Sequence, residues 1–143
     1  MDSLLTNYKN KKNINPTFKE EKEYIKKYFS LENIQEIFES LEKDKSDWAT
    51  KHLNVLRKKS PTSMAVALKQ LKLAKIMNLK DCLSMEFRIC QAMMSKNDFY
   101  EGVRANLVDK DRSPNWKPKS VFDLTSNIVD EHFLELKEKE LFN

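Results

Sequence analysis

The side chains that most often carry out chemistry are few in this 143-residue chain, and their spacing forms no known catalytic pattern. The histidines are His52 and His132, and the cysteines are Cys82 and Cys90. No set of these residues has the short spacing of a zinc site. No serine sits in the glycine-flanked turn that exposes a catalytic nucleophile, and His52 has no partner at a useful spacing, so we interpret it as a packing or surface residue. The sequence therefore predicts no metal centre and no nucleophilic catalysis within this chain.

A second cluster of reactive groups lies where Asp109 and Asp111 flank Lys110. Two carboxylates can hold a cation, but adjacent loop charges more often form a solvated turn, and we favour the turn. The cluster belongs to the segment from Asp98 to Pro118, which contains Gly102, the only glycine of the chain. This segment is predicted to be a short helix, a brief extended exit and a rigid loop, held in place by the helices around it.

The short helix is expected to be capped by Asn97 and Asp98. A glycine inside a helix costs ~1 kcal/mol relative to alanine, so we expect another backbone to approach closely at Gly102. Prolines restrict the loop that follows, and Trp116 is expected to anchor it to apolar surface. The side chains expected to point inward are Phe99, Val103 and Leu107, and Val108 is expected to leave the helix in an extended conformation.

The composition limits the class of protein. Hydrophobic residues make up 40% and charged residues 34%, a balance that suits a soluble helical domain. One glycine and four prolines argue against a β-sandwich and exclude glycine-rich phosphate loops. The net charge of +4 is better explained by solubility than by a nucleic-acid surface. No apolar run reaches the ~20 residues that span a membrane, and the two cysteines are expected to be small buried side chains in a reducing compartment.

The chain divides into an expected mobile leader, residues 1–15, and an all-α region, residues 16–143, of about six or seven helices. The leader is Lys- and Asn-rich and is neither a secretory signal nor a convincing mitochondrial presequence. Predicted helix starts are Ser30, Ser46, Ser60 followed by Pro61, Asn78, and Thr125 or Ser126.

Two of these helices carry the longest apolar patterns. The helix after Ser60 is expected to bury Met64, Ala67, Leu68, Leu71 and Ala74. The helix after Asn78 is expected to be central and to bury Leu79, Cys82, Leu83, Phe87, Cys90, Met93 and Met94. If Glu86 or Arg88 in that helix faces the core, it needs a charged partner. Together these stripes exceed what one small bundle can bury, so we expect an exposed hydrophobic face.

Four blocks of sequence carry a family resemblance. They are KSPTSMAVA (Lys59 to Ala67), MEFRICQA (Met85 to Ala92), DFYEGVRA (Asp98 to Ala105) and DKDRSPNWKP (Asp109 to Pro118). In order and spacing they resemble the C-terminal part of 3-hydroxyisobutyryl-CoA hydrolase, a family of the enoyl-CoA hydratase/isomerase (crotonase) superfamily. The likeness runs from about Ile14 to Phe133.

The resemblance implies different roles for the N-terminal and C-terminal parts of the family's proteins. Members of that family hydrolyse the CoA thioester of 3-hydroxyisobutyrate in mitochondrial valine degradation, a part of branched-chain amino acid catabolism. Their N-terminal crotonase core of ββα turns supplies the oxyanion-hole amides and the catalytic acids, and the C-terminal helices pack on it and help to enclose the acyl-CoA. No catalytic residue of the family falls in this chain, which we expect to be inactive alone, so whether it is part of an enzyme stays open. By the resemblance, Lys110 is a candidate contact to CoA, against the alternative of an ordinary surface lysine.

Two functions remain open from the sequence. In the first, the chain is the C-terminal portion of a 3-hydroxyisobutyryl-CoA hydrolase-like mitochondrial protein, whose partner is a crotonase core in cis or in trans. It would then meet acyl-CoA only with that core, and coenzyme A would enter as part of the substrate, with no cofactor and no membrane. In the alternative, it is a non-enzymatic component of the mitochondrial small ribosomal subunit, the one setting in which nucleic acid would be a neighbour. A weaker variant is a regulatory partner of a separate core.

Overall fold

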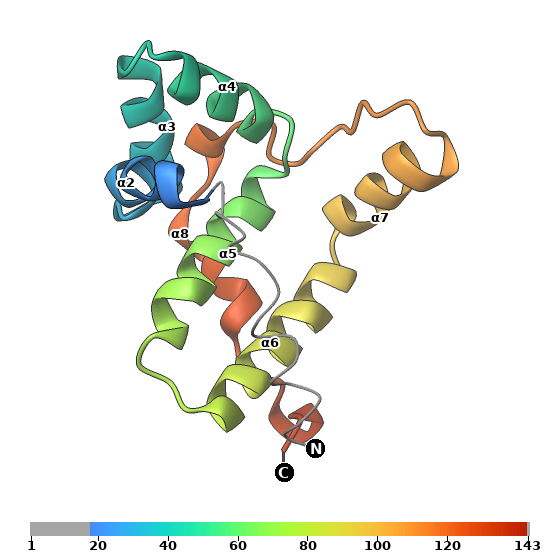
Figure 1. Cartoon of the computed structure of the whole chain (residues 1–143). Coiled ribbons are helices and arrows are strands. Elements are labelled where there is room, and N and C mark those ends of the chain that lie inside the picture. Colours follow the sequence, from blue (N-terminus) through green and yellow to red (C-terminus); the bar gives the residue numbers. More distant parts are fainter. Residues whose placement is uncertain (1–17, 143) are drawn as a thin grey trace, which may run out of the picture. The chain divides into compact units, whose positions relative to one another are not determined.

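The structure, a computed structural model, describes residues 18–142, and these residues form helices and loops with no strand (Figure 1). The predicted leader, residues 1–15, lies outside the described residues. The chain separates into two compact units, with the boundary between Leu31 and Glu32. The first unit contributes helix α2 (Phe18–Phe29), in which the Lys27 ammonium donates a hydrogen bond of 2.9 Å to the Tyr28 hydroxyl.

The second unit holds the remaining elements. They are α3 (Ile34–Lys43), α4 (Asp47–Leu56), α5 (Pro61–Ala74), α6 (Leu79–Met94), α7 (Asn97–Val103), the π-helical turn η1 (Arg104–Val108), the 3₁₀ turn η2 (Val121–Asp123), α8 (Ser126–Asp130), and the 3₁₀ turns η3 (Glu131–Phe133) and η4 (Lys137–Lys139). The described residues thus contain seven α-helices, which confirms the predicted all-α class and the helix number. None of the described helices is both long enough and apolar enough to cross a membrane.

Three of the predicted helix starts are confirmed by their caps. The side chains of Ser46, Ser60 and Asn78 each accept a hydrogen bond from the backbone N–H three residues further on. Such caps satisfy donors that the helix itself leaves unpaired, and each stabilises a helix by about 1 kcal/mol. Pro61 occupies the first turn of α5, where a missing N–H costs nothing.

The start predicted at Ser30 is wrong, because α3 begins three residues later behind Asn33. The Asn33 side chain accepts from the Glu36 N–H at 2.9 Å, and the Glu36 carboxylate accepts from the Glu32 N–H at 3.0 Å. These two bonds satisfy two backbone donors at the start of α3.

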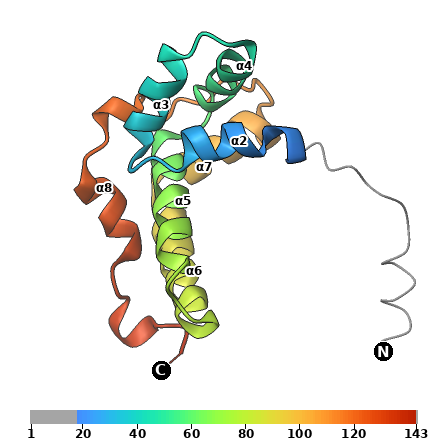
Figure 2. The same ribbon diagram turned by 60° about the vertical axis from the view of Figure 1, so that its left-hand side comes forward.

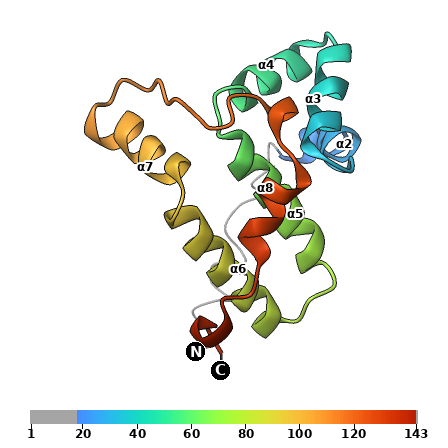
Figure 3. The same ribbon diagram turned by 180° about the vertical axis from the view of Figure 1, so that it is seen from behind.

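The core of the second unit lies between a helical hairpin, α5 and α6, and the C-terminal segment of α8 and η3. Figures 2 and 3 show this segment (red) running along one face of the hairpin. Val66, Met85 and Ile89 are the buried centre. The half-buried side chains packed against them are Leu73, Ala74, Met77, Met93, Val129 and Phe133. The α3–α4 pair adds further buried side chains: Ile34, Ile37, Phe38, Leu41, Ala49 and Leu53.

The face predicted to be buried on α5 is only partly correct, since Met64, Leu68 and Ala74 are half-buried and Ala74 packs on the core. Leu71 is 67% exposed and Ala67 is also exposed, whereas Thr62 and Val66 are buried. The helix carries apolar residues on more than one side. Periodicity identifies apolar stripes, but it does not say which of them meets the neighbouring helix.

The same correction applies to α6. Its core residues are Met85 and Ile89, while four members of the predicted buried stripe are exposed: Leu79, Leu83, Cys90 and Met94. These four residues, spaced 4, 7 and 4 apart, lie along one side of the helix, and we call them the outer stripe. The prediction that both cysteines are buried therefore fails for Cys90, whereas Cys82 is half-buried.

The charged residues of α6 have partners, as a charge near the core requires. The Arg88 Nε donates to both oxygens of the Glu140 carboxylate at 2.8 and 3.0 Å, and Leu136 N donates to the same carboxylate at 2.7 Å. The hydrogen bond from the Leu136 N–H, followed by that from Arg88, lowers the pKa of Glu140. This contact ties the C-terminal residues to α6. Glu86 is exposed and accepts from Gln70.

Candidate functional site

Asp98 is the buried junction that holds the segment from α7 to Pro118. The residue is 9% exposed. One carboxylate oxygen accepts a hydrogen bond from the Ser60 hydroxyl at 2.6 Å, and the other accepts from Lys117 N at 2.9 Å. The prediction that Asn97 and Asp98 cap α7 is wrong: the cap position is Lys96, which makes no side-chain cap bond. Asp98 instead joins the start of α5 to the far end of the loop.

Gly102 makes room for the indole ring of Trp116. A Cβ atom at Gly102 would lie 3.3 Å from Trp116 Cη2, which is tight. Trp116 is half-buried, and its Nε1 donates to the Lys58 carbonyl oxygen at 3.1 Å. The expected close approach is therefore real, but it comes from a side chain and not from another backbone. Trp116 thus anchors the loop through Gly102 and the Lys58 carbonyl oxygen, whereas the sequence predicted apolar surface as its anchor.

Substitutions at Gly102 should separate helix propensity from this steric contact. Alanine gains about 1 kcal/mol of helix propensity, which should roughly offset the small displacement of Trp116. Valine adds two branches against the ring, and we expect it to lower the free energy of unfolding by about 2 kcal/mol. Urea denaturation followed by tryptophan fluorescence measures both. A Gly102→Val variant as stable as the wild type would contradict this packing.

The loop after α7 is organised by Arg104. Its guanidinium bonds both oxygens of Glu101 at 2.7 and 2.9 Å, and it reaches one oxygen each of Asp109 and Asp111 at 2.7 Å. These hydrogen bonds, above all those with Glu101, raise the pKa of Arg104. Both aspartates thus form ion pairs with Arg104, a partner that the expected solvated turn did not include. Among the described residues, no group of three or more Asp, Glu, His or Cys side chains could hold a metal ion.

The end of α7 differs from the expected extended exit. Val108 belongs to the π-helical turn η1, which the hydrogen bond from Asp109 N to the Arg104 carbonyl oxygen closes at 2.8 Å. Phe99 and Leu107 are exposed rather than turned inward. The single wide turn brings the carboxylate of Asp109 to Arg104, which helical periodicity alone could not indicate.

Acid should loosen this loop. The hydrogen bonds from Arg104, and then from Asn115 N, lower the pKa of Glu101 from its usual 4.5 to about 2. A carboxylate whose folded pKa is lowered stabilises the fold above its unfolded pKa, and this contribution is lost as the pH falls through the folded value. We therefore expect the Asn115 amide resonance to keep its position well below pH 4.5 and to move only as the pH falls through about 2, the folded pKa of Glu101. If Glu101→Gln left the Asn115 amide resonance unchanged at neutral pH, the hydrogen bond from Asn115 N to the Glu101 carboxylate would be contradicted.

Lys110 stands at the tip of the loop that Arg104 organises. It has a φ of 58°, and Arg112 has a φ of 54°, so both adopt the left-handed conformation that is uncommon for residues other than glycine. Both side chains are exposed, and neither forms an ion pair or hydrogen bond with another described side chain. The neighbouring acids are already paired with Arg104. The loop therefore presents two uncommitted cations, which suits contact with an anionic group.

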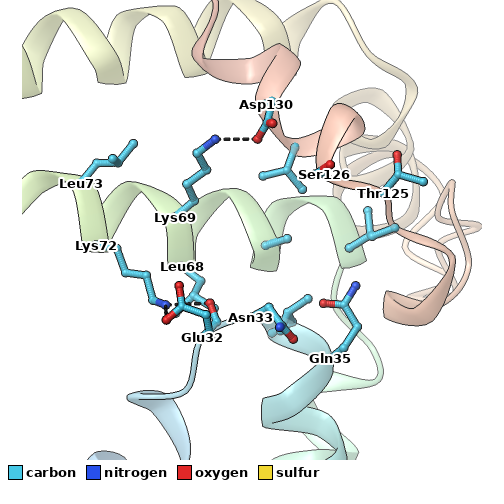
Figure 4. Close-up of a pocket in the computed structure, with 14 residues that line it drawn as sticks. Glu32, Asn33, Gln35, Leu68, Lys69, Lys72, Leu73, Thr125, Ser126 and Asp130 are labelled. Carbon is cyan, nitrogen blue, oxygen red and sulfur yellow. Dashed lines mark hydrogen bonds and ion pairs between the residues drawn. The ribbon is translucent and has the colours of Figure 1, made fainter.

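A larger pocket lies between the start of α3, α5 and the segment that leads into α8 (Figure 4). Its volume is about 690 Å³. Its apolar walls include Ile34, Leu68, Leu73, Leu124 and Val129. Two ion pairs form its rim, Lys69 with Asp130 at 2.6 Å and Lys72 with Glu32 at 3.1 Å. Sequence reasoning missed this pocket, and the only available signal was the two lysines three residues apart on α5.

The two histidines have separate roles. His52 stacks on Trp48 with ring centroids 3.8 Å apart, and its Nδ1 donates to the Trp48 carbonyl oxygen at 2.7 Å, which confirms the packing role. His132 is 1% exposed and lines a smaller pocket near the α6–α7 turn. Sequence patterns did not indicate this pocket, because its walls come from segments far apart in the chain.

The second unit exposes more large apolar side chains than the outer stripe alone. Leu71 and Ile76 are exposed in and after α5, and Tyr100 and Leu107 are exposed beyond α6. The expectation of an exposed hydrophobic face is thus confirmed for this unit. Scattered exposed apolar residues are ordinary, but a stripe along the longest helix is typical of a contact surface.

The sequence was compared with family models and with known proteins. Residues 1–133 match the family model of enoyl-CoA hydratase/isomerase. The chain is 43% identical over 122 residues to the mitochondrial 3-hydroxyisobutyryl-CoA hydrolase of Gallus gallus, which covers 85% of the chain and 32% of that protein. It is 38% identical over 143 residues to that of Homo sapiens, which covers 97% and 37%. The chain thus spans about a third of the length of the curated relatives it matches.

Solved structures agree in fold. A crystal structure of an enoyl-CoA hydratase from Rhodobacter sphaeroides superposes with a TM-score of 0.84 at 26% identity, over 92% of this chain and 39% of that one. A carnitinyl-CoA dehydratase from Mycobacterium thermoresistibile gives a TM-score of 0.83 at 24% identity, over 92% and 37%, and supports the fold alone. Because the family model matches residues 1–133 and the fold is shared with these structures, the chain belongs to the enoyl-CoA hydratase/isomerase family.

Proposed function

We propose that this chain is the C-terminal helical portion of a mitochondrial 3-hydroxyisobutyryl-CoA hydrolase-like protein, and that it completes an acyl-CoA site on a crotonase core supplied in cis or in trans. The observation that carries the proposal is the outer stripe of α6, an apolar surface that the described helices leave exposed. The match to about a third of each hydrolase supports it, because the remaining two thirds would supply the covering surface.

The chemistry of the loop supports a binding role and not a catalytic one. Thioester hydrolysis needs hydrogen-bond donors at the developing oxyanion and a positioned acid or base. Three carboxylates of the loop, Glu101, Asp109 and Asp111, are occupied by Arg104. Asp98 is occupied by Ser60 and Lys117. We therefore expect this chain to hydrolyse no acyl-CoA unless the core is present.

Lys110 is the residue that we propose to contact the CoA portion of the substrate. An exposed lysine ammonium on a held loop acts on a phosphate as a point charge. In the assembled protein, Lys110→Ala should raise KM for acyl-CoA about threefold to fivefold and leave kcat unchanged, as expected for one exposed ion pair. The matched control is Lys75→Ala, an exposed lysine after α5. Equal effects of the two substitutions would remove Lys110 from the CoA contact.

The proposed docking is tested with the complementary portion of the human 3-hydroxyisobutyryl-CoA hydrolase, truncated to omit the matching third. Sedimentation velocity of the mixture should show a complex that neither component forms alone. Absence of the complex, together with co-sedimentation of the chain with mitochondrial small ribosomal subunits, would favour the structural alternative.

A further inference from the structure

The larger pocket, between the start of α3, α5 and α8, has walls that a guest can still cover. Its volume of about 690 Å³ falls within the range of about 300–1,000 Å³ that is typical of small-molecule sites. Three of its apolar side chains, Leu68, Leu73 and Val129, are only half-buried, so each keeps surface that the described helices leave open. Contact of such surface with water is unfavourable, and an apolar guest would replace that water.

The apolar part of the walls is aliphatic. The described residues that line the pocket include no aromatic ring. Its apolar side chains are Ile34, Ala65, Leu68, Leu73, Leu124 and Val129. The walls therefore offer neither a ring for stacking nor a π face for a cation. This composition suits an alkyl chain better than a flat aromatic molecule.

The charged residues at the rim are already paired with one another. Lys69 Nζ donates to the Asp130 carboxylate at 2.6 Å. Lys72 Nζ lies 3.1 Å from the Glu32 carboxylate and donates to the Glu32 carbonyl oxygen at 2.6 Å. Figure 4 shows the two lysines leaving α5 in opposite directions, each toward its own partner.

This pairing favours a guest without charge. The two lysines and two carboxylates give the residues that line the pocket a net charge of zero. A charged guest would have to break an ion pair to gain a partner of its own, or enter an apolar space without one. A neutral guest leaves both ion pairs in place.

We propose that the larger pocket is a binding site for small neutral aliphatic molecules. The proposal goes beyond the docking of a crotonase core and does not depend on it, because all the walls come from the second unit of this chain. Lys110, the proposed contact to CoA, is not among the residues that line it.

The test compares three probes on the full chain with ¹³C-labelled leucine and valine methyl groups. The probes are hexan-1-ol, hexanoate and hexylammonium, which share the alkyl chain and differ in charge. Hexan-1-ol should produce saturable methyl shifts at Leu68 and Val129, and each charged probe should bind about tenfold more weakly. Val55, which is exposed in α4 outside the pocket, is the internal control and should show no saturable shift.

A substitution that fills the pocket completes the test. Ala65→Leu enlarges a half-buried side chain in the wall and should weaken the binding of hexan-1-ol about tenfold. Ala67→Leu makes the same change at an exposed position of α5 outside the pocket and should leave the affinity unchanged. Equal affinities of the two variants would place the alcohol elsewhere and overturn the proposal.

Two outcomes with the unchanged chain would also overturn it, and neither depends on the folding of a variant. If none of the three probes produces a saturable shift, the pocket takes only water or a protein surface. If hexanoate or hexylammonium binds as tightly as hexan-1-ol, the paired rim does not select a neutral guest.

Discussion

Replacing Asp98 by alanine should lower the free energy of unfolding by about 3 kcal/mol, the largest stability effect that we expect from one substitution outside the apolar core. The change removes the acceptor of two hydrogen bonds, from the Ser60 hydroxyl and from Lys117 N. Ser60 is buried, so its hydroxyl would lose its partner without gaining water. The loop would also lose its attachment to the start of α5.

Urea denaturation at neutral pH measures this effect, with an unchanged m-value as the sign that only stability changed. Asp98→Asn keeps one acceptor oxygen and should cost about half as much. Asp123→Ala is the matched control, since Asp123 is exposed in η2. If Asp98→Ala and Asp123→Ala have equal effects, Asp98 is not the junction that we describe.

A charge in the outer stripe should abolish docking while sparing the fold. Leu83 is exposed in the middle of the stripe, so Leu83→Lys should change the free energy of unfolding by less than about 1 kcal/mol. In a complex with the crotonase core, the lysine would be an unpaired charge at an apolar contact. We expect the affinity to fall about a hundredfold, which corresponds to about 2.7 kcal/mol.

The control for this variant is Gln91→Lys, an exposed position on the same helix outside the outer stripe. Isothermal titration of each variant with the core measures the dissociation constants. If Leu83→Lys and the wild type bind the core with equal affinity, the chain docks through another surface. In that case the proposed function could stand, but the outer stripe would not be its contact surface.

The sequence predicted where the helices start better than which side of each helix is buried. Caps at Ser46, Ser60 and Asn78 were predictable because a cap is a local interaction between a side chain and the backbone three residues away. The buried sides of α5 and α6 were not, because both helices have apolar residues on more than one side. Which side is buried depends on helices elsewhere in the chain.

The candidate site shows the same limit. Gly102 was correctly singled out as a position of close approach, but only the structure shows that Trp116 is what approaches. Asp98 has the residue type and position of a helix cap, so the sequence predicted that it caps α7. Its true partners, Ser60 and Lys117, lie 38 and 19 residues away. Lys110 stays a prediction carried by the resemblance, since its exposure on the loop is compatible with CoA contact and with an ordinary surface position.

The most direct measurement of the central claim is release of free thiol from 3-hydroxyisobutyryl-CoA by the purified chain, with and without the truncated human hydrolase core. We expect the chain alone to match the buffer rate, and the mixture to hydrolyse the thioester faster than the core alone. Thiol release by the chain alone, above the buffer rate and proportional to its concentration, would contradict the account.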